Sequence, residues 1–481
     1  MTVNFDHLVV LMLENRSFDH MLGRLYHPDN PPPYNQPPNG QSFDGVVDGM
    51  SNPFIISNPF APPVEFSVSR IPSPDYAAPQ DNSVGHQFPD VQMQLYGMPG
   101  QPGSMQGFVN NRLIQFKVPH VVTQAELQAV MAGFSPTTTT ADGNGPYAAC
   151  TTLSTLASAF AVCDNWYSSM PGPTFCNRSF LHAGTSNGWT SNNNDWTLND
   201  NPTIFNALLA LQGPSGAKIY HGNGTTYPGY KSLPCLTYYI HPTIPIPIDD
   251  KNTIQQFCAD AANGALASYS FIEPEIIGCD DGIPPNDQHP ARDIRYGENL
   301  INTVYQAVRG GPLWERTLLV VTYDEHGGFF DHRVPPAVAA PNPADPPGED
   351  GFKFTSLGLR VPAVLISPWI AAGTVFHPTQ AVDHTAVIRT LCNRWNLPPL
   401  TQRDANAIDF STVLGTTLRP LSDTPVPSFW NPPPVASDAD VMLNDLQIDF
   451  LALVANRHRL KRPPLLTQAD ARRFLKTLPA E

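Results

Sequence analysis

The chain has 481 residues, enough to bury a large core, and its apolar and aromatic contents are those of a globular protein rather than a disordered one. Its formal net charge of -15 argues against non-specific nucleic-acid binding and against strongly anionic membranes. The sequence contains neither a transmembrane run of about 18 apolar residues nor the pattern of a signal peptide. It therefore predicts a cytoplasmic protein, with an exported mature form as the alternative and the oligomeric state left open.

Proline and cysteine usage describe the loops and the thiols. The 53 prolines cluster at 28–79, 335–347 and 420–434, which predicts long, conformationally restricted loops around a rigid fold. The seven cysteines are irregularly spaced, odd in number and without a Cys-x-x-Cys pair. We expect reduced, mostly buried thiols rather than a disulfide framework.

In the N-terminal part of the chain, apolar patterns predict a strand, a long loop region, a helix and a second strand. The apolar run 8–13 is too short for a helix and predicts a strand buried on both faces. Residues 24–104 show little periodicity and are expected to form ordered loops. Apolar side chains recur every three to four residues over 146–160, as in an amphipathic helix, and 161–167 follows as a short strand.

In the C-terminal part, strands and helices alternate. We expect strands at 268–272, 317–323 and 363–366, helices at 297–309 and 381–395, and a mostly helical region from 437 onward. This alternation favours an α/β fold with a largely parallel central sheet flanked by helices. We assign 1–415 to one catalytic domain and 416–481 to a C-terminal helical extension packed on it.

Polar residues follow the first predicted strand directly. Glu14 and Asn15 come after the run 8–13, and in open α/β sheets the chemistry gathers at such strand ends. Their oxygens are the hard ligands that a divalent cation prefers. The alternative is that Asn15 and Ser17 cap a following helix while Glu14 is a solvated loop residue.

Two further loops offer matching groups. Thr174 lies in a turn after the predicted strand 161–167, and Asp324 and Glu325 directly follow the strand 317–323. Together with Glu14 and Asn15, these residues could form a cation site containing a hydroxyl nucleophile. Taken separately, Thr174 could be a simple turn residue and the two carboxylates a solvated turn.

Such a site also needs groups that bind phosphoryl oxygens and protonate a leaving oxygen. His86, His289, Asn177 and Arg178 lie near suitable loops, and His326 follows the paired carboxylates directly. A competing motif, the Gly-x-Ser-x-Gly pattern at 184–188, lacks a buried strand before it, and we interpret it as a turn.

Four segments in order resemble one known family. They are Glu14-Asn15-Arg16-Ser17-Phe18-Asp19-His20, Thr174-Phe175-Cys176-Asn177-Arg178, Asp324-Glu325-His326-Gly327-Gly328-Phe329-Phe330-Asp331-His332 and Gly358-Leu359-Arg360-Val361-Pro362. These segments resemble the phosphoesterase family that contains bacterial phospholipases C, plant non-specific phospholipases C and related acid phosphatases. The resemblance implies an alkaline-phosphatase-like fold, one divalent metal and a phosphorylated-enzyme intermediate.

The resemblance also implies roles for the candidate residues. The metal ligands would be Glu14, Asn15, Thr174, Asp324 and Glu325, with Thr174 as the nucleophile. His86 and His289 fall where the family places phosphate-binding or acid/base histidines, and Asn177, Arg178 and His326 would bind substrate. Cys176 stands where the family usually has proline, which puts in doubt the stiffness of that turn.

The Asp-Glu pair at 324 and 325 resembles the phospholipase C branch rather than the acid phosphatases. We therefore expect metal-dependent cleavage of a phospholipid, such as phosphatidylcholine, to diacylglycerol and a phosphorylated head group. The alternatives are a phosphomonoesterase, acting on a small phosphoester, and a catalytically silent binding protein. The metal could be Ca, Mg, Mn or Zn, nucleic acid is not expected as a partner, and contact with a membrane surface would be transient.

Overall fold

The structure is a computed structural model, which describes residues 5–54, 62–78, 84–97, 105–116, 120–222, 235–245, 253–278, 284–432, 441–461, 464 and 467–478. Cys279 lies outside these ranges. The six described cysteines are free thiols and five of them are buried, as the sequence predicts. None of the described helices has the length and apolar character needed to span a membrane.

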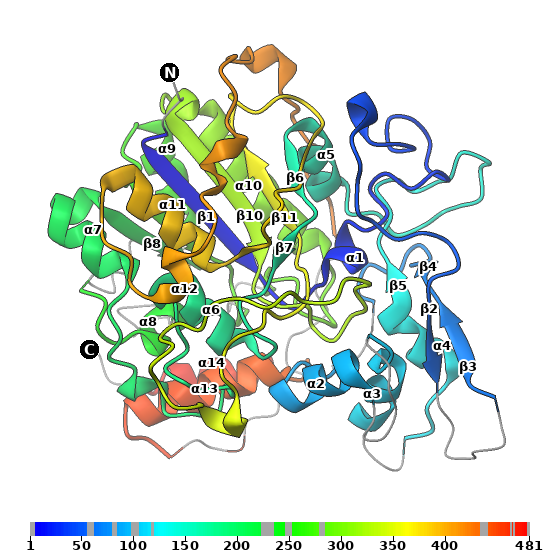
Figure 1. Ribbon diagram of the computed structural model, residues 1–481, viewed down its shortest axis with the longest axis horizontal. Helices are drawn as coiled ribbons and strands as arrows, with labels where there is room; N and C mark the ends of the chain where they lie inside the picture. The colour runs from blue at the N-terminus through cyan, green and yellow to red at the C-terminus, as the bar shows by residue number, and fades with distance from the viewer. Residues whose placement is uncertain are drawn as a thin grey trace.

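A seven-stranded sheet forms the centre of the molecule, in the order β12-β6-β11-β10-β1-β9-β8 (Figure 1). Its neighbours pair in parallel except around β11, which is antiparallel to both β10 and β6. The predicted α/β class with a largely parallel sheet is confirmed. The strands are β1 (His7–Leu13), β6 (Ala161–Cys163), β8 (Ala217–His221), β9 (Tyr269–Glu273), β10 (Thr317–Tyr323), β11 (Ala363–Ile366) and β12 (Thr374–Phe376).

The strand β1 lies in the middle of this sheet, between β10 and β9. Its residues from Leu8 to Leu13 are fully buried, which confirms a strand covered on both faces. The pairing with β10 runs residue for residue from His7 opposite Thr317 to Leu13 opposite Tyr323. Both strands therefore end at the same edge of the sheet.

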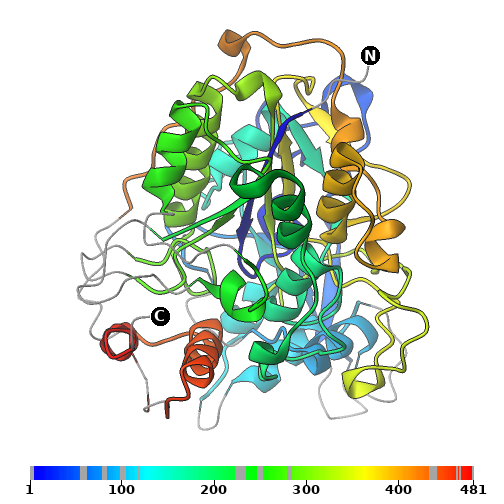
Figure 2. The same cartoon turned by 90° about the vertical axis from the view of Figure 1, so that its left-hand side faces the viewer.

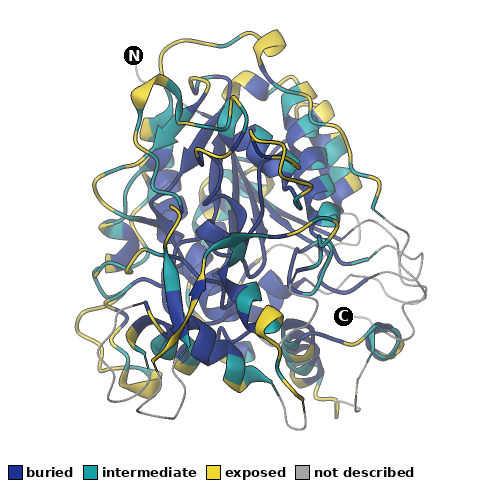
Figure 3. Ribbon diagram, turned by 90° about the vertical axis from the view of Figure 1, so that its right-hand side faces the viewer, coloured by how far each residue is buried: buried dark blue, intermediate teal, exposed yellow. Residues whose placement is uncertain are grey.

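Helices cover the two faces of the sheet, as Figure 2 shows edge-on, with α10 on one side and α11 on the other. The helix α10 (Arg295–Gly310) packs on α5 (Thr151–Ala159), α9 (Ile254–Ala262) and the central strands. On the other face, α6 (Thr174–Ala183) packs on α7 (Ile204–Gln212) and α11 (Thr385–Trp395). The strands are consequently among the most buried parts of the chain (Figure 3).

Two predicted helices and one predicted strand have different bounds in the structure. The helix expected at 146–160 starts only at Thr151, because the buried Glu298 carboxylate accepts hydrogen bonds from the first-turn amides of Thr152 and Leu153, at 2.6 and 3.2 Å. The strand expected at 161–167 divides into β6 and β7 (Trp166–Tyr167), and β7 pairs with β13 (Val382–Asp383). The helix expected from 381 therefore begins at Thr385.

A smaller lobe lies beside the sheet, on the right in Figure 1. The prediction that 24–104 contains only loops is wrong, because short strands and one helix in this range carry too few residues to show a period. The lobe contains β2 (Ser51–Phe54), β3 (Val64–Ser67), β4 (Ser69–Arg70), β5 (Ala132–Gly133), α2 (Phe88–Tyr96), α3 (Phe108–Gln115) and α4 (Gln124–Gln128).

Two C-terminal helices, α13 (Asp445–Arg457) and α14 (Gln468–Leu475), lie beyond one end of the sheet, near α2 (Figure 1). The helix α13 packs on α8 (Leu236–Ile240). Two further short helices are α1 (Phe18–Met21) and α12 (Gln402–Ala405). The Ser17 side chain caps α1 by accepting a hydrogen bond from the His20 amide. Ser17 thus caps α1, as the alternative interpretation expected, whereas Asn15 does not.

A buried ionic cluster ties the ends of several loops to the sheet. The Arg360 guanidinium donates to Asp19 and Asp331, both at 2.9 Å, and His332 pairs with Asp19 at 2.7 Å and with Asp44 at 3.1 Å. Asp19, Asp331 and His332 place ligand atoms within 4.8 Å of one another, the spacing of a cation site. Arg360 already supplies the positive charge there, so these residues have a structural function.

Replacing His332 by glutamine is expected to make stability less dependent on pH. Burial lowers the pKa of His332, but its hydrogen bonds to Asp19 and Asp44 outweigh burial and raise it to about 9. A histidine whose pKa is higher in the folded than in the unfolded protein stabilises the fold while it is protonated. This stabilisation is complete below the pKa of the unfolded protein, near 6.5, and is lost as the pH rises through 9. We expect the free energy of unfolding of wild type to exceed that of His332→Gln by about 3 kcal/mol at pH 6. This difference should vanish by pH 10.

The measurement is thermal unfolding of both proteins between pH 6 and pH 10. The wild-type minus variant difference isolates His332 from other groups that titrate in the same range. A difference that stays constant with pH would contradict the assignment.

Candidate active site

The adjacent ends of β1 and β10 bring four of the predicted site residues together. Glu14 and Asn15 follow β1, while Asp324 and Glu325 follow β10. The Asn15 amide donates to Asp324 Oδ1 at 2.9 Å, which joins the two strand ends directly. All four residues are buried.

Backbone conformation at this junction is restricted. Asn15 has a φ of 54°, a left-handed conformation that asparagine tolerates better than most residues. Gly327 also has a positive φ, and a Cβ there would lie 2.1 Å from the Asn15 carbonyl oxygen. The Gly after Glu325-His326 is therefore required for the close approach of the two loops.

Thr174 is the first residue of α6 and is fully buried. Its hydroxyl lies 3.4 Å from both Glu14 Oε2 and Asn15 Oδ1. The Asn177 side chain fixes the preceding turn, because its amide group donates to the Gly172 carbonyl at 2.8 Å while its oxygen accepts from the Met170 amide at 3.0 Å. Asn177 thus positions the turn that carries Thr174.

Asp324 and Glu325 each have one carboxylate oxygen that backbone amides hold and one that they leave unpaired. Asp324 Oδ1 accepts from two backbone amides, and Glu325 Oε2 accepts from the Gly327 amide at 2.7 Å. Their other oxygens, Asp324 Oδ2 and Glu325 Oε1, are buried and have no hydrogen-bond partner among the described residues, and the same holds for Asp287 Oδ2. Unpaired buried carboxylate oxygens are costly unless a cation balances them. These residues therefore fit a divalent cation with oxygen ligands.

The pKa values of the carboxylates also fit a site that would hold a divalent cation. Burial raises the pKa of Glu325 to about 8, with the His86 charge lowering it and Asp324 raising it. Burial also raises the pKa of Glu14 well above its usual range, although the Arg178 guanidinium lowers it. Arg178 forms a buried ion pair with Glu14 and donates to the Met12 carbonyl at 3.1 Å, so it holds Glu14 at the end of β1.

Two histidines and an aspartate line another side of the site. Asp445, the first residue of α13, contacts His86 Nε2 through Oδ2 at 3.1 Å and His289 Nε2 through Oδ1 at 3.2 Å. Burial lowers the pKa of His86, but the charges of Asp445 and Glu325 raise it well above its usual range. His289 Nε2 also lies 3.1 Å from Asn15 Nδ2, the side-chain nitrogen, which connects the histidines to the strand ends.

His326 and His384 lie behind the carboxylates. His326 Nε2 donates to Gln94 Oε1 of α2 at 2.7 Å, and its Nδ1 lies 3.2 Å from Glu325. Burial lowers the pKa of His326 to about 3, so the ring is neutral. His384 Nε2 donates to the Asp324 carbonyl at 2.7 Å and fixes that strand end from the opposite side.

The predicted residues divide into two groups by their contacts. Glu14, Asn15, Thr174, His289 and the carboxylate pair form one connected cluster, which His86 joins through Asp445. Asn177 and His326 have most of their hydrogen-bonding groups occupied by the protein. Arg178 uses Nη2 for Glu14 and Met12, while its buried Nε and Nη1 have no partner among the described residues. The role of all three as substrate ligands stays a prediction. The motif 184–188 continues α6 into a turn that starts at the left-handed Gly184, as interpreted from the sequence.

Sequence reasoning missed two residues of the site, Asp445 and Asp287. An acidic residue in the first turn of a helix ordinarily indicates only a favourable helix dipole, so Asp445 gave no separate signal. Asp287 lies within the segment that carries His289, and its position among apolar and amide residues was the available hint.

Residues 5–398 match the model of the Phosphoesterase family. The chain is 37% identical to non-specific phospholipase C6 of Arabidopsis thaliana over 435 residues, covering 87% of this chain and 74% of that protein. It is 34% identical to non-specific phospholipase C3 of the same plant, covering 93% and 81%. Phospholipase C B of Mycobacterium tuberculosis is 27% identical, with 88% and 80% covered.

Solved structures give looser likenesses. PsFucS1 sulfatase from Pseudoalteromonas sp. aligns with a TM-score of 0.32 and 15% identity, covering 56% of this chain and 67% of that one. The lipoteichoic acid synthase LtaP from Listeria monocytogenes aligns with a TM-score of 0.33 and 10% identity, covering 57% and 72%. These TM-scores are too low to support any functional conclusion.

Removing the charge of Glu325 is expected to abolish stabilisation by divalent cations. Wild-type protein should gain about 2.7 kcal/mol at a cation concentration 100 times its Kd. Glu325→Gln should lose this response and unfold at a higher temperature than cation-free wild type, because the variant buries one unpaired carboxylate fewer.

Thermal unfolding with Ca, Mg, Mn or Zn, after dialysis against chelator, measures both effects. Glu315→Gln, which removes an exposed carboxylate just before β10, is the matched control and should respond like wild type. Equal cation responses in Glu325→Gln and wild type would rule out Glu325 as a ligand.

Proposed function

Because the chain belongs to the Phosphoesterase family, and is therefore a phosphoric ester hydrolase, we propose that it is a phospholipase C that uses Thr174 as its nucleophile. The substrate would be a phospholipid, as in the similar phospholipases C, and the bond cleaved would join phosphorus to the glycerol oxygen. The observation that carries this proposal is the buried Thr174 hydroxyl, which lies between Glu14 and Asn15 and close to unpaired carboxylate oxygens.

In the first step, Thr174 Oγ1 attacks phosphorus and the bond to diacylglycerol breaks. The hydroxyl proton passes to a neighbouring acceptor, for which Glu14 Oε2 at 3.4 Å is placed. His86 carries a proton because its pKa is raised, so it can protonate the departing glycerol oxygen. A divalent cation bound by Glu14, Asn15, Asp324 and Glu325 would polarise the nucleophile and offset phosphoryl charge.

In the second step, water attacks the phosphorylated Thr174. Having given up its proton, His86 accepts one from the water, and the threonine oxygen regains the proton held by Glu14 as its bond to phosphorus breaks. The products are the phosphorylated head group and the original enzyme, so protons and bonds balance over the cycle. His289, whose Nε2 lies 3.1 Å from Asn15 Nδ2, would bind a phosphoryl oxygen.

Thr174→Ala is expected to lower turnover of phosphatidylcholine vesicles by about 10³-fold or more, since the variant lacks the attacking oxygen. Thr174→Ser should retain measurable turnover because it keeps a hydroxyl. Release of diacylglycerol and of phosphocholine measures the reaction, and p-nitrophenyl phosphate tested beside it should be a poor substrate.

Thr155→Ala in α5 serves as the control for loss of a threonine side chain away from the site. Undiminished turnover in Thr174→Ala would refute the nucleophile. Faster hydrolysis of the monoester than of the phospholipid would instead favour a phosphatase.

Asp445→Asn is expected to lower kcat by about 10- to 100-fold with little change in KM, because the carboxylate holds both histidines and keeps His86 charged. Asp445→Glu should restore part of the loss, which a purely structural role in α13 would not predict. Asp423→Asn removes an exposed carboxylate elsewhere and should behave as wild type. Full activity in Asp445→Asn would show that the histidines act without it.

A further inference from the structure

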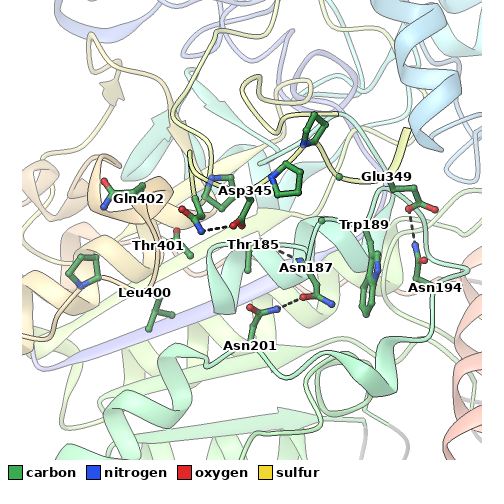
Figure 4. Close-up of a pocket in the computed structure, with 17 residues that line it drawn as sticks. Thr185, Asn187, Trp189, Asn194, Asn201, Asp345, Glu349, Leu400, Thr401 and Gln402 are labelled. Carbon is green, nitrogen blue, oxygen red and sulfur yellow. Dashed lines mark hydrogen bonds between the residues drawn. The ribbon is translucent and has the colours of Figure 1, made fainter. Parts of the chain in front are cut away.

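A wide groove lies away from the active site, at the opposite end of α6 from Thr174. Figure 4 shows the residues that line it. Its volume is about 890 Å³, within the range of small-molecule sites. Three segments line it: the loop after α6 from Thr185 to Asn201, the Pro-rich loop from Pro341 to Glu349, and the start of α12 with the residues before it, 399–402. None of the residues of the candidate active site lines this groove.

The charges of the groove exclude an anionic ligand. Among the described lining residues, the charged ones are Asp345 and Glu349, and both are carboxylates. A phosphate, sulfate or uronate group would meet repulsion there without a compensating cation. The groove therefore suits a ligand that carries no negative charge.

Its polar groups match hydroxyls, which donate and accept hydrogen bonds at the same atom. Asn201 donates a hydrogen bond to the side-chain oxygen of Asn187 at 3.0 Å, which orients the Asn187 amide group. The NH₂ group of Asn187 donates to no described residue. No hydrogen bond within the described chain reaches the side-chain amide of Gln402. Asp345 Oδ1 accepts a hydrogen bond from Asn342 at 2.6 Å, and Asp345 Oδ2 accepts none from the described residues. Figure 4 shows these donors and acceptors on different walls of the groove.

An aromatic side chain completes the set. Trp189 is partly exposed to the groove, and its ring is held in place by Trp196, with ring centroids 4.9 Å apart. A fixed indole presents an apolar surface to the C–H face of a sugar ring, while the amides and carboxylates bind its hydroxyls. Prolines at 341, 346, 347 and 399 make the walls stiff, which limits the entropy lost on binding.

We propose that this groove binds a neutral oligosaccharide, independently of the phosphoesterase reaction. Trp189 would stack on one sugar ring, while Asn187, Gln402 and Asp345 would hydrogen-bond its hydroxyls.

Isothermal titration with maltotriose, cellotriose and chitotriose, three neutral trisaccharides, tests the proposal. We expect at least one to bind with a Kd of about 1 mM, typical of a solvent-exposed polar site. The double variant Asn187→Gly, Gln402→Ala should weaken that binding by about tenfold or more, because two hydrogen-bonding amides are lost. Both positions are exposed, and glycine suits the positive φ of 59° at position 187, so folding should be preserved.

The matched control is Asn193→Ala, which removes an exposed amide from the same loop without touching the groove. It should bind like wild type, and inorganic phosphate should not compete. Absence of binding by all three sugars at about 20 mM, or equal binding by the double variant and wild type, would overturn the proposal. Turnover of phospholipid by the same proteins is a separate readout and should be unchanged.

Discussion

The parallel pairing of β1 with β10 positions the rest of the site. Because Leu13 lies opposite Tyr323, the residues that follow the two strands, Glu14 and Asp324, emerge side by side. The hydrogen bond from the Asn15 amide to Asp324 then fixes the two loops against each other. A shift of one residue in this register would turn the carboxylates toward opposite faces of the sheet, so the buried apolar strands determine the chemistry at their ends.

The site combines fixed carboxylates with groups from distant parts of the chain. Backbone amides hold one oxygen of Asp324 and one of Glu325, which leaves the other oxygens with no freedom to turn toward solvent. Positive charge offsets the cost of that burial. Arg178 supplies it at Glu14, and a divalent cation would supply it at the remaining oxygens. Preorganised charge of this kind is what stabilises a phosphoryl-transfer transition state.

The sequence allowed the strands at 8–13, 317–323 and 363–366 to be predicted because each is a short apolar run followed by polar residues. It also allowed Glu14, Asn15, Thr174 and the Asp324-Glu325 pair to be predicted as neighbours, since parallel strands end at one edge. The contribution of Asp445 could not be predicted, because its contact with His86 and His289 arises from the packing of α13 and leaves no local pattern. The buried ionic cluster around Arg360 also joins residues far apart in the chain, so its contacts leave no local pattern.

The start of α6 has a consequence for the nucleophile itself. Thr174 stands at the first position of a ten-residue helix whose N-cap, Pro173, makes no side-chain capping bond. The positive end of the helix dipole therefore points at the hydroxyl and at whatever anion approaches it. Negative charge that develops on Thr174 Oγ1 or on a bound phosphoryl group would be favoured by about 0.3 to 2 kcal/mol, a bias built into the backbone that no side-chain substitution at the site would remove.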